Sequence, residues 1–290
     1  MQRRYDPYWK GVLEEVFEDF LRFVFPNADK VLDLKKGFQF LDKELGAMYP
    51  EPDSPGQARY VDKLVKVFLR NGKERCILVH VEVQGYYDPE FSSRMFRYYY
   101  KILDRFSSPV TAIAIFSGAD KKWAPPCHED ECLGTRLFYQ YNTIRVIDYP
   151  DIKLEQSDNP FALVMLIVKK TVLNGGAPDE VLLKTKLHLA RILLAKGLFT
   201  KPKIRAVFTF LNNYIRFEKS TTYRIFEKQL DILTEKKNTM GIVEQVIEVR
   251  TKEFVANLLK ETRFSVTKIA SLANVSEEFV VRIKNRLKKK

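Results

Sequence analysis

The sequence is poor in cysteine and contains no long apolar run. Three cysteines among 290 residues form a small, odd-numbered set, which argues against the disulfide scaffold of a secreted protein. The longest unbroken apolar stretch, 161–168, is far shorter than the roughly 20 residues that a membrane span needs. The N-terminal segment carries charge with no apolar run behind it, so no signal peptide is visible. We therefore expect a reduced, cytoplasmic protein with no membrane partner.

The composition is that of a folded, basic protein. Hydrophobic residues make up 46% of the chain and aromatic residues 13%, which is enough for a packed core and excludes disorder of the bulk. The net charge is +12, from 49 basic and 37 acidic residues. Such an excess also serves solubility, but it favours polyanionic partners and nucleic acid first, because lysine and arginine release counterions from phosphates.

The first half of the chain predicts a mixed sheet flanked by helices. Asn71-Gly72 joins two β-forming segments and is a strong hairpin signal. Asp88-Pro89-Glu90 supplies the cap, the proline and the acidic first turn of a helix. The expected elements, in order, are a helix at 8–25, a short strand at 37–45, hairpin strands at 60–69 and 75–84, a helix ending near 106, a buried strand at 109–116 and a strand at 143–149.

After Asn159-Pro160 the pattern becomes helical. We expect a core domain at 1–155, a helical region at 156–240 and a C-terminal segment at 241–290. The stretch SVTKIASLANVSEEFVVRIKN resembles a helix-turn-helix, although Glu277 and Glu278 would meet phosphates unfavourably. A helical hairpin for packing or dimerisation fits equally well, so a homo-oligomer stays open. The basic tail, with Lys288 and Lys289, would hold DNA without sequence preference.

One constellation on the predicted hairpin carries chemistry. Residues two apart on a strand share a face, so Glu82 and Gln84 project together. If facing positions sum to 144, Asp62 lies directly across from Glu82; a loop shorter by one residue would set it against Val81 instead. Two facing carboxylates repel unless a cation bridges them, and an oxygen-rich site suits Mg²⁺ or Mn²⁺. The alternative is an ordinary solvated sheet face.

This arrangement resembles the PD-(D/E)XK nuclease superfamily, and more narrowly the Rpn family of recombination-promoting nucleases, also described as transposase-like. The resemblance lies in RYVDKLVKVFLRNG and LVHVEVQGYYDPEFSSRMFRYYYKI, with YDPYWKGVLEEVFEDFLRFVFP before them and NPFALV after them. Together these stretches cover most of residues 5–165. The resemblance implies an α/β fold, with a restriction-endonuclease-like mixed sheet flanked by helices and an all-helical C-terminal region. It also implies metal-dependent DNA endonuclease activity, a hydrolase function linked to recombination or mobile elements.

The resemblance assigns the catalytic positions to Asp62, Glu82 and Gln84, with Asp62 and Glu82 as metal ligands. Gln84 stands where the wider superfamily has lysine; it can orient water or phosphate but brings no charge. Activation of water would then rest on the metal or on another residue, such as Lys66, which is also a candidate DNA contact.

Two supporting residues come from helices. Glu15, or its neighbour Glu18, would complete the metal shell, against the simpler interpretation of a solvated helix face. Arg94 matches the family pattern and would clamp a phosphate, with a packing or surface role as the alternative. The cluster from Cys127 to Cys132 lacks the spacing of a zinc site, so we expect a surface loop there.

Two other functions stay open from the sequence alone. One is a DNA-binding protein whose nuclease-like domain is catalytically inert, and the other is a protein-interaction module with no affinity for DNA.

Overall fold

The structure is a computed structural model, and it divides the chain into two compact units, Met1–Glu227 and Lys228–Lys290. Each unit is described by itself. The residues that the structure describes are 6–41, 43, 63–70, 76–84, 87–119, 124–197, 199–235, 252, 255–260, 262, 264–273 and 277–287. The boundary expected near residue 155 falls inside the first unit.

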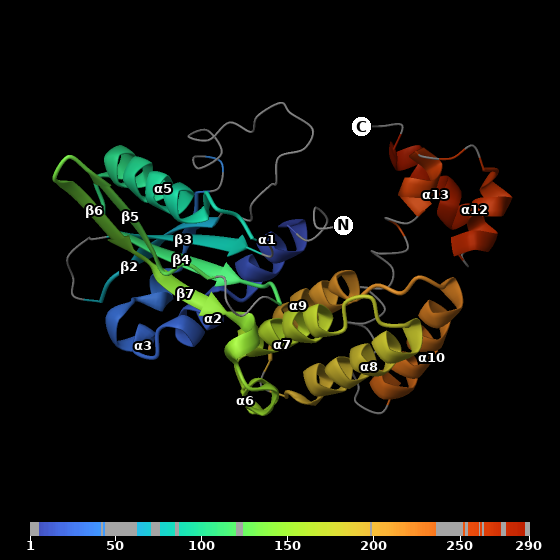
Figure 1. Ribbon diagram of the computed structural model, residues 1–290. Helices are drawn as coiled ribbons and strands as arrows, with labels where there is room; N and C mark the ends of the chain where they lie inside the picture. The colour runs from blue at the N-terminus through green and yellow to red at the C-terminus, as the bar shows by residue number, and fades with distance from the viewer. Residues whose placement is uncertain are drawn as a thin grey trace. The chain divides into compact units, whose positions relative to one another are not determined.

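The first unit is built around a mixed five-stranded sheet with the order β1-β2-β3-β4-β7 (Figure 1). β2 is antiparallel to β1 and β3, whereas β3, β4 and β7 run parallel. The expected α/β class with a mixed sheet is therefore confirmed. The strands are β1 (Gln39–Phe40), β2 (Lys63–Phe68), β3 (Cys76–Gln84), β4 (Val110–Phe116) and β7 (Asn142–Arg145).

One face of the sheet is covered by α5 (Phe91–Phe106), which connects β3 to β4 (Figure 1). Its buried side chains recur at helical spacing and form one apolar stripe. Phe91 and Met95 pack with Ala114 and Phe116 of β4, while Tyr98 and Ile102 pack with Leu64 of β2. The stripe fixes the helix along the middle of the sheet.

The opposite face meets α1 (Asp6–Glu15) and α2 (Phe17–Val24), with the short α3 (Ala28–Val31) after them (Figure 1). Phe17 lies edge-on to Phe40, with ring centroids 5.7 Å apart, and Glu14 pairs with the buried Lys63. The sequence predicted a single helix at 8–25, whereas the structure has two, α1 and α2. Val16, with φ −115° and ψ 24°, leaves the helical region and divides it, which lets both halves follow the sheet.

The helical layer of the first unit follows β7 and the turn at Val146–Asp148. Residues 161–168 are all buried in α7 (Pro160–Leu173), and they are the longest apolar run of the sequence. Asn159 caps that helix by accepting from the backbone N–H of Phe161 and donates to the carbonyl of Asp19, so it also ties the helix to α2. The helices are α6 (Asp151–Gln156), α7 (Pro160–Leu173), α8 (Asp179–Ala195), α9 (Lys201–Tyr214) and α10 (Ser220–Glu235), the last of which crosses into the second unit.

Three expected elements near the sheet differ from the structure. Of the strand expected at 37–45, the described residues 37–41 and 43 contain only the two-residue strand β1, although Leu41 still donates to the carbonyl of Leu64. The strand at 143–149 begins one residue earlier and ends at Arg145, where a 3-10 turn (Val146–Asp148) replaces it. The surface loop expected around Cys127–Cys132 is wrong, because that segment is strand β5, paired with β6 (Thr135–Gln140).

The described part of the second unit is helical. It comprises the last residues of α10, helical residues at 252 and 255–260, α12 (Val266–Ala273) and α13 (Glu277–Leu287). Ile269 and Ala270 of α12 are buried against Val280 and Ile283 of α13, as the sequence predicts. Among the described residues of the whole chain, no helix is long and apolar enough to cross a bilayer.

Candidate functional site

The hairpin of β2 and β3 has the register that the site requires. Lys63 pairs with Val81, Leu64 with His80 and Lys66 with Leu78, so facing positions sum to 144. The alternative register, which would set Asp62 against Val81, is thereby excluded for the described pairs, and the predicted register is confirmed for them. Asp62 itself lies outside the described residues.

Glu82 and Gln84 occupy the carboxyl end of β3, a central strand of the sheet. Their backbone partners in the parallel strand β4 are Ala114 and Phe116. Both partners are buried in the cluster that contains Phe91 of α5. Glu82 and Gln84 therefore occupy backbone positions in the part of the sheet that α5 covers, and their strand lies between β2 and β4.

α5 carries Arg94 to the same end of β3. The helix runs antiparallel to β3 and β4, because it connects two parallel strands. Its Tyr98 packs against Leu64, the partner of His80. One helical turn back along α5 is about 5.4 Å, and two residues forward along β3 are about 6.7 Å. Arg94, one turn before Tyr98, therefore lies near the level of Glu82.

Arg94 forms an ion pair with Asp88 just before α5 begins. Nη1 of Arg94 is 2.5 Å from Oδ2 of Asp88, and the two side chains are only 12% and 13% exposed. Oδ1 of Asp88 accepts from the backbone N–H of Glu90 at 3.0 Å. The sequence pattern assigned Asp88 to the start of the helix alone and missed its pairing with Arg94. Asp88 and Arg94 are six residues apart on either side of the helix start, and no sequence pattern predicts an ion pair at that spacing.

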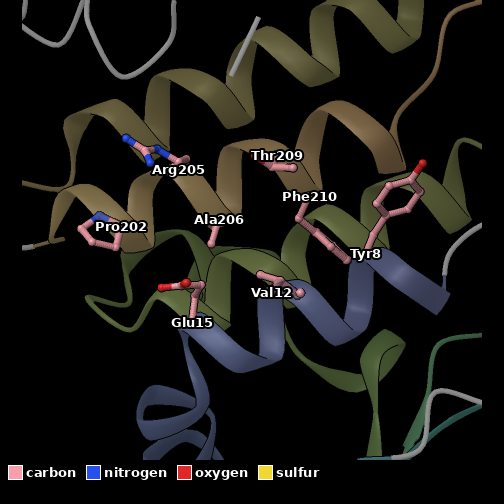
Figure 2. A pocket seen from close by; sticks show the side chains of 9 residues that line it. Tyr8, Val12, Glu15, Pro202, Arg205, Ala206, Thr209 and Phe210 are labelled. Atoms are coloured by element: carbon pink, nitrogen blue, oxygen red, sulfur yellow. The ribbon is translucent and has the colours of Figure 1, made fainter. Parts of the chain in front are cut away.

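Glu15 lies apart from β3. It lines an open pocket of about 270 Å³ between α1 and α9, together with Val12, Arg205 and Phe210 (Figure 2). The carboxylate of α1 that reaches the sheet is that of the preceding residue, Glu14, which pairs with Lys63 on the face opposite α5. The structure does not bring Glu15 to Glu82, because the helical periodicity of α1 turns Glu15 toward α9.

Lys66 lies on β2, on the face of Leu64, but toward the far end of the strand. It pairs with Leu78, four residues before Glu82, which is about 13 Å along the strand. Its ammonium lies 5.9 Å from the ring centroid of Phe68. This placement separates Lys66 from the level of Glu82.

The remaining candidates lie elsewhere. Lys288 and Lys289 are outside the described residues. Glu277 and Glu278 begin α13 with exposed side chains, as expected from the sequence. Cys127 and Cys132 are free thiols on the ribbon of β5 and β6, where burial raises the pKa of Cys127 and a hydrogen bond to Glu129 adds to the rise. In the described part of the chain, no three histidine, cysteine or acidic side chains are grouped to hold a metal ion.

The side chains of the predicted donor set have the chemistry that a divalent metal ion requires. Asp62 and Glu82 would supply carboxylate oxygens and Gln84 an amide oxygen, which are the hard ligands that Mg²⁺ and Mn²⁺ prefer. The register brings the chain positions of this set into one part of the sheet as far as it is described. The residues therefore suit such an ion, with Glu15 removed from the set.

Comparisons with known proteins give no relative: no protein-family model, no curated protein and no solved structure matches the chain.

Proposed function

We propose that the chain is a Mg²⁺- or Mn²⁺-dependent DNA endonuclease whose first unit has a restriction-endonuclease-like core. The observation that carries the proposal is the hairpin register, in which facing positions sum to 144. The proposal requires that this register continue by one pair, from Lys63 and Val81 to Asp62 and Glu82. The antiparallel hairpin, the crossover helix α5 and the parallel strand β4 support it as the framework that such a site needs.

The reaction proposed is hydrolysis of a phosphodiester. The oxygen of a water molecule forms a new bond to phosphorus, and the bond from phosphorus to one sugar oxygen breaks. The sugar oxygen that leaves takes up a proton, and the attacking water gives one up. Asp62 and Glu82 would hold the metal, which when bound would polarise the phosphate and lower the pKa of the attacking water. Gln84 would orient the water or a phosphate oxygen through its amide. The net charge of +12 favours binding of the DNA backbone.

The net charge supports a polyanionic substrate, whereas DNA as the substrate and the link to recombination or mobile elements follow from the family resemblance. No sequence preference is part of the proposal. The basic tail with Lys288 and Lys289 would add contacts to phosphates that do not depend on sequence.

The test is nicking of supercoiled plasmid by the purified full-length chain, with Mg²⁺, with Mn²⁺ and with a chelator. Asp62→Asn and Glu82→Gln each remove one charge with little change of shape, and each should lower the rate at least about 100-fold. Asp104→Asn, at an exposed position near the end of α5, is the matched control and should cut at the wild-type rate.

The outcomes separate the competing functions. Metal-dependent cutting that is lost in both carboxylate variants, with unchanged circular dichroism and unfolding, supports the proposal. Tight, salt-dependent binding without cutting would indicate the inert DNA-binding protein. Absence of both would indicate a protein-interaction module and would overturn the proposal.

A further inference from the structure

The ion pair of Asp88 and Arg94 joins the segment that follows β3 to the first turn of α5. Both side chains are almost buried, and the Nη1–Oδ2 distance is 2.5 Å. Nη1 of Arg94 donates to Oδ2 of Asp88, and a charge-assisted hydrogen bond of this kind restrains the orientation of the guanidinium. Because Oδ1 of Asp88 also accepts from the backbone N–H of Glu90, the carboxylate is itself anchored to the start of α5.

A chain of ring contacts places this pair at the end of the sheet. The guanidinium carbon of Arg94 lies 5.3 Å from the ring centroid of Phe91. Phe91 packs on Phe116, with centroids 5.0 Å apart, and Phe116 is the backbone partner of Gln84. The helical spacing from Tyr98 places Arg94 near the level of Glu82 independently, as described above. Both observations place Arg94 near the end of β3 that carries Glu82 and Gln84.

We infer that Asp88 is a positioning residue, which holds the guanidinium of Arg94 where it meets a phosphate of bound DNA. This inference rests on the proposed function and deepens it. Arginine recognises phosphate through two parallel N–H donors, which demands a fixed orientation of the fork. A carboxylate beside a phosphate repels it, so an aspartate at this place is unfavourable for DNA binding unless it orients the arginine. The inference assigns that task to Asp88.

The two possible roles of Asp88 predict opposite signs for one substitution. Asp88→Asn keeps an oxygen that accepts from Glu90 and removes one negative charge. If Asp88 only adds repulsion, Asp88→Asn tightens DNA binding. If Asp88 positions Arg94, the same change weakens binding about tenfold, the order of one lost charge-assisted hydrogen bond.

The experiment measures DNA affinity and cutting for wild type, Asp88→Asn, Arg94→Ala and the double variant, all full-length. We expect the KM for DNA to rise about tenfold in Asp88→Asn, with a much smaller change of kcat. In the Arg94→Ala background, Asp88→Asn should weaken affinity no further, because its effect passes through Arg94. The slope of log affinity against log salt should become shallower in both single variants, by the contribution of about one phosphate contact.

The failures of the two proposals can be told apart. A wild-type protein that neither cuts nor binds DNA overturns the proposed function. A wild-type protein that cuts, combined with tighter binding by Asp88→Asn or with effects that add in the double variant, overturns the positioning role alone. Arg97→Ala, on the exposed side of α5, is the charge-matched control for Arg94→Ala and should leave KM near the wild-type value.

Discussion

At the scale of single residues, two buried charges hold the helical layer together. Asp179 begins α8 and is buried, yet its carboxylate accepts three hydrogen bonds. The donors are the backbone N–H groups of Glu218 and Lys219, each at 2.9 Å, and the hydroxyl of Thr222 at 2.8 Å. No local pattern in the sequence marks Asp179 for this role. Its bonds reach about forty residues along the chain and anchor the start of α10.

This anchor predicts a dependence of stability on pH. Burial alone would raise the pKa of Asp179, but the hydrogen bonds from Glu218, Lys219 and Thr222 hold it below the usual aspartate value of 3.8. A lowered folded pKa gives stability that is present above the unfolded value and lost as pH falls through the folded pKa. The melting temperatures of the wild type and of Asp179→Asn should therefore converge below pH 3.8 and differ most above it. A difference that stays constant down to acid pH would contradict this.

Lys186 is the second buried charge and is fully inaccessible on α8. Its ammonium donates to the carbonyls of Asn212, at 3.2 Å, and Ile215, at 3.0 Å, at the end of α9. The rings of Phe217 and Phe226 lie 4.9 and 4.7 Å from the same ammonium. A cation at a helix C-terminus meets the negative end of the helix dipole, so Lys186 joins α8 to α9.

Replacing this lysine leaves polar groups buried without their donor. We expect Lys186→Met to lower the free energy of unfolding by about 2–4 kcal/mol, because the carbonyls lose a charged partner while the volume is nearly kept. Urea unfolding measures the change. Lys184→Met, at an exposed position on the same helix, is the control. Equal stability of the two variants would refute the capping role.

At the scale of elements, the ribbon of β5 and β6 shows how a polar strand escapes prediction. β5 contains acidic residues between two cysteines and lacks apolar alternation. It becomes a strand because Tyr139 of β6 and His128 of β5 pack on Phe96 of α5, with centroids 5.7 Å away in each case. Tertiary contact with α5 therefore decides this element.

The turn of this ribbon yields a prediction about its stability. Leu133 and Gly134 both have positive φ, 46° and 88°, as in the tight turn that favours asparagine followed by glycine. Leu133 is fully exposed, so its side chain contributes no packing. Leu133→Asn should stabilise the ribbon by about 0.5–1 kcal/mol, and Leu133→Val should destabilise it, because a β-branched residue tolerates positive φ poorly. Hydrogen exchange of the ribbon amides measures both; slower exchange in Leu133→Val would contradict the turn geometry.

At the scale of the whole molecule, the excess of basic residues bears on DNA binding. Each phosphate neutralised by lysine or arginine contributes about 0.9 to the slope of log affinity against log salt. If the +12 charge serves DNA, affinity should fall at least about tenfold between roughly 50 and 200 mM salt. Fluorescence anisotropy with a labelled duplex measures this. Affinity that does not change with salt would point to a partner other than DNA.

Much of this framework could be predicted from the sequence because it depends on local signals. The hairpin strands and the buried strand β4 follow from runs of β-branched residues and a turn dipeptide, but the sequence left two registers open and the structure shows which one the described pairs adopt. The apolar stripe of α5 follows from helical periodicity. Asn159 stands before Pro160 where the helical pattern begins, but its bond to the carbonyl of Asp19 is contained in no local pattern.

The sequence by itself determined the class of the fold and the order of its main elements, because periodicity and turn chemistry are properties of neighbouring residues. The tertiary structure decided between the two hairpin registers that the sequence left open. Only the tertiary structure decided that Glu14 and not Glu15 meets the sheet, that the acidic segment at Cys127–Cys132 is a strand, and that Asp88 holds Arg94. Those outcomes depend on which surfaces pack together, because the contacts that stabilise them are made by tertiary packing and not by the local sequence.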